Sequence, residues 1–115
     1  MTSLVKGVVF ITGAGSGKQT AALAHDSNHF IGIGQYAAYA LARYGIRHIA
    51  ISDIKLESLD QTERELKKNH SDIDILKIQV DTSIEDSVNS AIDQTISKYG
   101  RIDIAINNAG EHSCI

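Results

Sequence analysis

The sequence predicts an α/β fold built on a doubly wound parallel sheet, and two observations support that prediction. Short apolar runs alternate with helical patterns along the chain. A glycine-rich stretch, ITGAGSGKQT, directly follows the first apolar run. Strands that alternate with helices imply parallel pairing. We expect the strand order 3-2-1-4. Such a sheet ordinarily continues to further strands, so we also expect the fold to be incomplete.

Four segments are expected to form the strands. Residues 6–11 are rich in valine, which is typical of a strand that is buried on both faces of a parallel sheet. The other three apolar runs are residues 46–53, 73–80 and 101–106. Each is short enough for a strand and is followed by polar residues or glycine. We therefore expect the carboxyl ends of these strands to lie along one edge of the sheet.

Three segments are expected to form helices. Residues 34–44 have a face of small alanines that can lie close to a sheet, and Gly45 suits the position that ends this helix. Residues 56–69 form an amphipathic pattern with charges outside the apolar stripe. The leucines of that stripe are Leu56, Leu59 and Leu66.

The third helix is expected to begin with a capping box and to end at Gly100. In this box Thr82 would cap a free backbone amide and Glu85 would reach back to the cap. The apolar face of this helix is expected to comprise Ile84, Val88, Ala91, Ile92, Ile96 and Tyr99.

Composition excludes several classes of protein. The chain has 115 residues, which fits one domain or part of one, and its net charge of -3 gives no reason to expect nucleic acid or a membrane surface as a partner. No apolar run approaches the length of a membrane span. With one cysteine, Cys114, no intramolecular disulfide can form, so we expect a cytoplasmic protein. His25 and His29 lack further ligands of matching spacing, and we expect no metal site.

The glycine-rich stretch allows two phosphate-binding interpretations. In the loop of a nucleotide kinase, the Gly-Lys pair would be Gly17 and Lys18, but the first glycine then falls on Thr12 and the Ser/Thr position falls on Gln19. In a dinucleotide loop, a helix should follow the last glycine at once. If residues 18–32 are removed, the chain reads VVFITGAGSG-IGQYAAYALARYG, which has a continuous T-G-x-x-x-G-x-G motif that opens a helix.

With that segment removed, the sequence resembles the short-chain dehydrogenase/reductase family and its Rossmann fold. The motif residues are Thr12, Gly13, Gly17 and Gly34. Gly13 permits the tight turn, Gly17 lets the backbone approach a pyrophosphate, and Gly34 lets the helix pack on the strand. The amides at the helix N-terminus would then face the phosphates.

Two further motifs extend the resemblance. VDTS, residues 80–83, resembles the end of the third strand in the family, which implies that Asp81 contacts adenine. NNAG, residues 107–110, resembles the motif after the fourth strand, which implies a structural Asn107 and a cofactor-side Asn108. The cofactor-binding residues that the motifs imply are Gly13, Ser16, Gly17, Ile33, Gly34, Asp53, Asp81, Thr82, Asn108, Ala109 and Gly110.

Asp53 ends the second strand, where dinucleotide folds place an acid for the adenosine ribose. A carboxylate there repels a 2′-phosphate, so we expect NAD to be preferred over NADP. Without the resemblance, Asp53 is a solvated strand-end residue or a helix cap.

Residues 18–32 are predicted to be an insertion within the glycine-rich loop. One hypothesis is a retained intron, because Gly-Lys codons can contain a donor site and fifteen codons keep the frame. The alternative is a true surface insertion, in which QTAALAH could form a helical turn or two.

The resemblance implies an oxidoreductase that transfers hydride between a nicotinamide and a carbonyl or alcohol carbon. In the family, the catalytic tyrosine is followed four residues later by a lysine, but no tyrosine of this chain has that lysine, and we assign no catalytic residue. We expect the chain as written to lack activity. The alternative is a non-catalytic dinucleotide-binding fragment or an unstable product. Small-molecule substrate binding and homo-oligomers are expected only of a complete protein.

Overall fold

The computed structural model describes residues 7–15 and 32–108. Its four strands form one parallel sheet in the order β3-β2-β1-β4, as predicted. The strands are β1 (Val8–Thr12), β2 (His48–Asp53), β3 (Asp74–Gln79) and β4 (Ile104–Asn107). The helices are α1 (Ile33–Arg43), α2 (Leu59–Asn69) and α3 (Glu85–Tyr99), and a short 3-10 helix, Leu56–Ser58, precedes α2. At most of their ends, the segments predicted from sequence lie within three residues of the ends of these elements.

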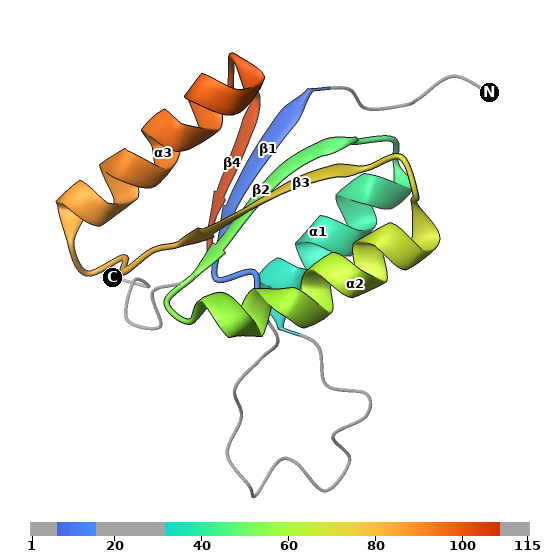
Figure 1. Cartoon of the computed structure of the whole chain (residues 1–115), viewed down its shortest axis with the longest axis horizontal. Coiled ribbons are helices and arrows are strands. Elements are labelled where there is room, and N and C mark those ends of the chain that lie inside the picture. The colour runs from blue at the N-terminus through green and yellow to red at the C-terminus, as the bar shows by residue number, and fades with distance from the viewer. Residues whose placement is uncertain (1–6, 16–31, 109–115) are drawn as a thin grey trace, which may run out of the picture.

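The sheet separates two layers of helices. Helices α1 and α2 cover one face, and α3 covers the other (Figure 1). Every residue of β1 is buried, because β1 lies between two strands and has helices on both sides. The central position of β1 explains why its sequence is continuously apolar rather than alternating.

Two hydrophobic clusters fill the spaces between the sheet and the helices. Alternate residues of each strand face opposite sides, so Val9 and Ile11 pack towards α1 and α2 whereas Phe10 packs towards α3. The larger cluster comprises Val9, Ile11, Ala14, Ala38, Ala42, Ile46, Ile49, Ile51, Leu59, Leu66 and Ile73. The smaller cluster comprises Phe10, Ala50, Ile78, Val80 and Ala91. The predicted small face of α1 therefore does lie against the sheet.

Glycines end α1 and α3 as predicted. Gly45 follows α1 with a φ of 116°, and its amide donates to the carbonyl of Ala42 while the amide of Ile46 donates to the carbonyl of Leu41. This pair of bonds is the Schellman arrangement, which favours glycine at the left-handed position. Gly100 ends α3 with a φ of 86°.

The predicted capping box at α3 is wrong. The residue that precedes the helix is Ile84, and its N-cap position carries no side-chain hydrogen bond. Asp81 instead forms a turn, in which its Oδ1 accepts hydrogen bonds from the amide and hydroxyl of Ser83. This turn uses the polar residues before the helix and delays the first helical residue to Glu85.

Two predicted apolar faces are only partly buried. Leu56 lies in the 3-10 helix rather than in α2 and is 43% exposed, because the different helical geometry takes it off the stripe. Ile84, which precedes α3, and Ile96 on α3 are 51% and 43% exposed. No described residue packs over that side of α3 closely enough to bury them.

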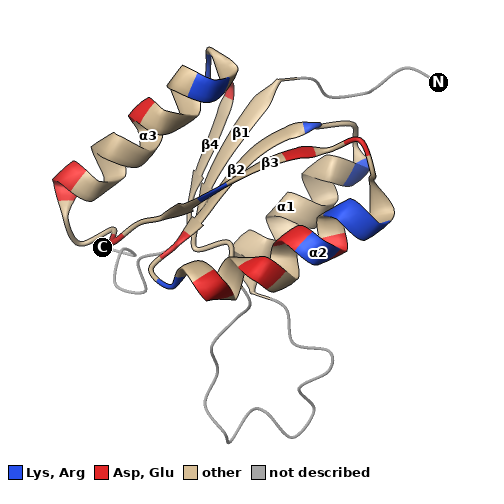
Figure 2. Cartoon of the chain, in the orientation of Figure 1, with Lys and Arg blue, Asp and Glu red and all other residues tan. Residues whose placement is uncertain are grey.

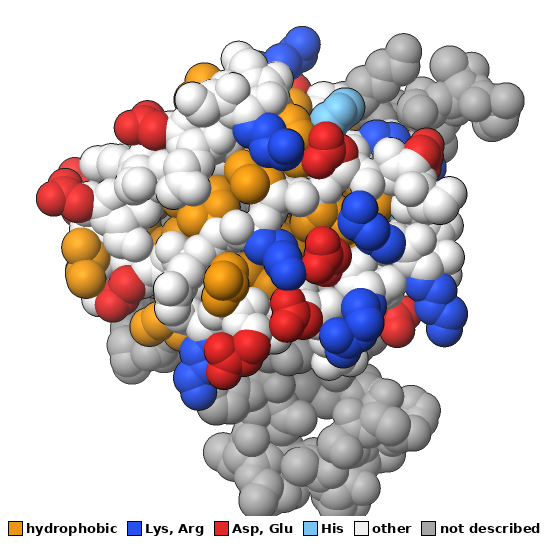
Figure 3. Space-filling view, viewed as in Figure 1, with side chains coloured by type: hydrophobic (Ala, Val, Ile, Leu, Met, Phe, Trp, Pro, Cys, Tyr) orange, Lys and Arg blue, Asp and Glu red, His pale blue; other side chains and the backbone are white. Residues whose placement is uncertain are grey.

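Charged residues mark one edge of the sheet. The ammonium group of Lys77 on β3 lies 2.9 Å from a carboxylate oxygen of Asp60 and 2.9 Å from one of Glu63, both on α2. These hydrogen bonds raise the pKa of Lys77. Figure 2 shows basic and acidic positions alternating along α2, and Figure 3 shows basic and acidic side chains next to one another on the same face of the molecule. A paired lysine on an edge strand also disfavours pairing with a further strand.

Candidate functional site

The carboxyl ends of three strands meet at one place on the sheet. Thr12, the last residue of β1, is in register with Ser52 of β2 and with Asn107 of β4. In doubly wound sheets, ligands bind at this edge. Gly13 to Gly15 follow β1 here, and α1 begins beside them with Gly32 as the residue that precedes the helix.

Gly13 and Gly34 have the roles that the sequence predicts for the two glycines. Gly13 has a φ of 70°, a left-handed conformation that side chains disfavour, and it turns the chain away from β1. A methyl group at Gly34 would overlap the carbonyl oxygen of Gly13. The first turn of α1 can therefore lie against the turn after β1 only because residue 34 has no side chain.

Asp53 connects the end of β2 to the turn at residues 13–15, called the glycine turn below. Its Oδ2 accepts a hydrogen bond of 2.9 Å from the amide of Gly15, and its Oδ1 accepts one of 2.7 Å from the amide of Ile54. Two backbone donors thus orient the carboxylate beside the turn. A side chain at Gly15 would overlap the hydroxyl of Ser58 and the Asp53 carboxylate, so only glycine permits this approach.

The side chain of Thr12 connects β1 to β4. Its hydroxyl donates to Oδ1 of Asn107 over 2.7 Å and accepts from the amide of Asn108 over 3.0 Å. The predicted structural role of Asn107 is consistent with this bond, which connects β1 to β4. Asn108, whose amide donates to the same hydroxyl, is half-buried at the edge of the sheet.

Asp81 lies near the start of the loop that follows β3. Hydrogen bonds from the Ser83 hydroxyl and amide hold the pKa of Asp81 below its usual value. Its amide donates to the hydroxyl of Ser87 over 3.0 Å, which connects the loop to α3. Asp81 is therefore an anion held in a fixed turn, and Thr82 follows it half-buried.

The structure describes seven of the eleven predicted cofactor-binding residues, and all of them end a strand, lie in the loop after one or begin α1. They are Gly13, Ile33, Gly34, Asp53, Asp81, Thr82 and Asn108. Ile33 is the first residue of α1 and is 74% exposed. Ser16, Gly17, Ala109 and Gly110 lie outside the described residues, as does nearly all of the predicted insertion.

Sequence reasoning did not single out two residues of this site. The Gly15 amide orients Asp53, and Thr62 donates its hydroxyl to the carbonyl of Ala14 over 2.7 Å. The glycine-rich pattern was a signal for Gly15. Thr62 had none, because its partner lies 48 residues earlier in the chain.

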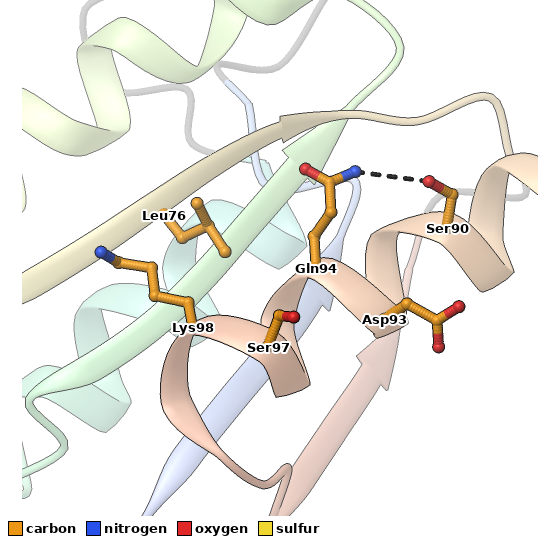
Figure 4. Close-up of a pocket in the computed structure, with 6 residues that line it drawn as sticks. All are labelled: Leu76, Ser90, Asp93, Gln94, Ser97 and Lys98. Atoms are coloured by element: carbon orange, nitrogen blue, oxygen red, sulfur yellow. Dashed lines mark hydrogen bonds between the residues drawn. The ribbon is translucent and has the colours of Figure 1, made fainter.

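A hollow beside α3 lies away from this edge. It has a volume of about 440 Å³ and opens broadly to solvent. Its lining comes from β3 and α3: Leu76, Ser90, Asp93, Gln94, Ser97 and Lys98 (Figure 4). Gln94 and Ser90 bond to each other there over 3.4 Å. The hollow shares no residue with the glycine turn.

The family model described as short chain dehydrogenase matches residues 29–114. The chain belongs to the short-chain dehydrogenase family. Membership favours the dinucleotide interpretation of the glycine-rich stretch over the kinase interpretation. The observed sheet and helix arrangement is that of the Rossmann-type α/β fold.

Individual relatives agree with the family assignment. The chain is 32% identical over 112 residues to the short-chain dehydrogenase anuF of Penicillium roqueforti, a match that covers 96% of this chain and 35% of that protein. The chain described here spans about a third of the length of the curated relatives that it matches.

Solved structures of other short-chain dehydrogenases superpose on the chain. L-sorbose reductase from Gluconobacter frateurii, solved with NADPH and L-sorbose, has a TM-score of 0.74 and 27% identity, over 96% of this chain and 36% of that one. The 3-ketoacyl-(acyl-carrier-protein) reductase from Brucella melitensis, solved with NADH, has a TM-score of 0.62 and 27% identity, over 86% of this chain and 32% of that one.

Among the described residues, no helix is long and apolar enough to cross a membrane.

Proposed function

We propose that this chain forms the dinucleotide-binding part of an NAD(P)-dependent oxidoreductase that transfers hydride between a nicotinamide and a carbonyl or alcohol carbon. The main support is the convergence of Gly13, Gly34 and Asp53 at the carboxyl end of β1 in a short-chain dehydrogenase. In such an enzyme the nicotinamide supplies or accepts the hydride, and the protein residues bind and orient it.

The pyrophosphate of the dinucleotide would lie at the start of α1. The first turn of α1 has free backbone amides, and the helix dipole gives this end partial positive charge. No acidic residue occupies that first turn to oppose an anion. Ile33 is exposed at this end of the helix. It would contact the bound phosphates together with Ser16 and Gly17.

The adenosine half would extend towards the ends of β2, β3 and β4. Asp53 would accept hydrogen bonds from the ribose hydroxyls, and Asp81 would accept one from the adenine amino group. Thr82, Asn108, Ala109 and Gly110 would line the same half. This assignment accounts for polar residues that follow three separate strands.

We further propose that NAD is preferred over NADP. The structures of relatives contain either NADPH or NADH, so membership in the family leaves the preference open. The Asp53 carboxylate is fixed by two backbone amides and cannot turn away without losing both bonds. A 2′-phosphate beside it would meet a negative charge.

No residue of this chain is assigned to proton transfer. The tyrosines of the chain are Tyr36, Tyr39, Tyr44 and Tyr99, and none has a lysine four residues later. Cofactor binding is therefore the function that the described site supports, and we expect the chain alone to lack dehydrogenase activity.

Titration of the full chain with NADH and NADPH, followed by nicotinamide fluorescence, tests the proposal. We expect tighter binding of NADH, and we expect Asp53→Asn to reduce the preference by about tenfold, because the ribose contact and the repulsion both weaken. Asp93→Asn, on α3 and outside the site, is the matched control and should change nothing. Equal affinities for the two nucleotides in the unaltered chain would contradict the NAD preference, and no binding of either would contradict the function.

A further inference from the structure

A buried threonine holds the carbonyl group of the glycine turn. Thr62 lies on α2 and is completely buried. Its hydroxyl donates a 2.7 Å hydrogen bond to the carbonyl oxygen of Ala14, directly after Gly13. Because the carbonyl is shielded from water, loss of this donor would leave it without a partner among the described residues.

A buried glutamine holds the start of α1. Gln35 is 2% exposed, although it is polar and lies in the first turn of a helix. Its Oε1 accepts from the amide of Gly32 over 3.4 Å, and its Nε2 donates to the hydroxyl of Tyr39 over 2.9 Å. Both ends of the amide are thus used, which fixes the side chain between the N-terminus of α1 and the next turn.

Tyr39 lies between these two anchors. Burial raises the pKa of its hydroxyl, and its hydrogen bond with Gln35 and the nearby Thr62 hydroxyl oppose that rise. The hydroxyl therefore stays protonated across the physiological range. Three polar side chains from α1 and α2 consequently lie together. At one end Thr62 bonds to the carbonyl of Ala14 in the turn after β1, and at the other end Gln35 bonds to the amide of Gly32 at the start of α1.

The geometry points to a positioning function. We propose that Thr62, Tyr39 and Gln35 set the spacing between the turn after β1 and the N-terminus of α1, so that the backbone there matches a pyrophosphate. This inference rests on the proposed function, since it concerns the same site. An apolar trio of similar size would fill the space between the helices equally well but would bond to neither backbone segment.

The test compares Thr62→Val with Thr62→Ser in the full chain. Valine keeps the volume and removes the hydroxyl, whereas serine keeps the hydroxyl. The readouts are the affinity for ADP-ribose by calorimetry and the affinity for adenosine, which lacks the pyrophosphate, by NMR titration. We expect Thr62→Val to weaken ADP-ribose binding about tenfold with adenosine binding unchanged, and Thr62→Ser to restore it.

Thr95→Val is the matched control. Thr95 is also completely buried and donates to a helix carbonyl, that of Ala91, over 2.8 Å, but it lies on α3 across the sheet. A purely structural effect would appear in both valine variants. If Thr62→Val fails to fold, Tyr39→Phe is the milder variant, and we expect about a threefold loss of ADP-ribose affinity.

The outcomes separate the two proposals. If the unaltered chain binds ADP-ribose and the ratio of ADP-ribose to adenosine affinity is the same in Thr62→Val, or in Tyr39→Phe where that variant replaces it, as in Thr95→Val, the positioning role is overturned and the proposed function stands. If the unaltered chain binds no ADP-ribose, both are overturned. A selective loss of ADP-ribose affinity supports the positioning role.

Discussion

Gly34 and Gly100 are both required to be glycine, but for opposite physical reasons. Gly34 has ordinary helical backbone angles and no room for a side chain, because the Gly13 carbonyl lies against it. Gly100 has open space around it but a φ of 86°. The first requirement is steric and belongs to the site, whereas the second is conformational and belongs to the end of a helix.

We expect Gly34→Ala to reduce the free energy of unfolding by about 2 kcal/mol, as overpacking in a close contact does. Gly100→Ala should cost only about 1 kcal/mol, because the left-handed conformation is its sole penalty. Urea unfolding measures both. Only Gly34→Ala should also weaken NADH binding, and equal loss of binding in the two variants would contradict the steric assignment.

Asp103 provides a pH-dependent contact at the opposite end of β1. Hydrogen bonds from Arg101 and from the amide of Val8 hold the pKa of Asp103 below its ordinary value. Because the folded-state pKa is lowered, the stabilisation is complete above the pKa of an unfolded aspartate. It is lost as the pH falls through the lowered pKa.

NMR titration of the carboxyl groups tests this assignment. In Arg101→Gln, the pKa of Asp103 should rise towards its usual value, because the strongest interaction is removed. The pKa of Asp81, which Ser83 lowers, should not change and serves as the internal control. An unchanged pKa for Asp103 would show that Arg101 has no part in the shift.

At the scale of elements, one buried side chain adds to the pairing of β1 and β4 at their carboxyl ends. Thr12 is 2% exposed and bonds to Asn107 and Asn108. Thr12→Val keeps the shape and removes both bonds, so we expect a loss of about 1–2 kcal/mol in the free energy of unfolding by urea. Thr12→Ser should recover most of it. Equal stability of the valine and serine variants would show that the contribution of Thr12 comes from packing alone and not from its hydrogen bonds.

The elements themselves were predictable because their signals are local. Apolar runs, the alanine face of α1 and the glycines after α1 and α3 all act through neighbours in the chain. The start of α3 was not predicted, because two local interactions compete there and Asp81 forms its turn with Ser83 in place of a cap at Thr82. The exposure of Ile96 depends on what packs over α3, which periodicity does not report.

The site was predictable only in part. Gly13, Gly34 and Asp53 follow from the motif and from the ends of strands. The bond between Thr62 and Ala14 joins residues 48 positions apart, and the bond between Gly15 and Asp53 joins residues 38 apart. A threonine in an amphipathic helix has no sequence mark that distinguishes a buried donor from a surface hydroxyl.

At the scale of the whole molecule, the predicted insertion at residues 18–32 can be tested by deletion. The deletion joins Gly17 to Ile33, so a glycine again precedes α1. Closing a short connection costs less entropy than closing a long one, and we expect a gain of about 1 kcal/mol in the free energy of unfolding. NADH should also bind more tightly, since the phosphate loop becomes continuous.

A variant in which Gly/Ser residues replace positions 18–32 is the control, because it keeps the length and changes the sequence. It should resemble the unaltered chain in urea unfolding and in NADH titration. A deletion that lowers stability would mean that these residues are an integral part of the fold, and the hypothesis of a retained intron would then be abandoned.

The central position of β1 has a consequence for synthesis. β1 leaves the ribosome first, yet the bond between Thr12 and Asn107 spans 95 residues. At ordinary elongation rates this interval lasts about 5–20 s. Throughout it, the most apolar strand of the sheet lacks one of its two neighbours. We therefore expect chaperones that shield apolar segments to bind the nascent chain, and the proposed cofactor site to be complete only after β4 has emerged.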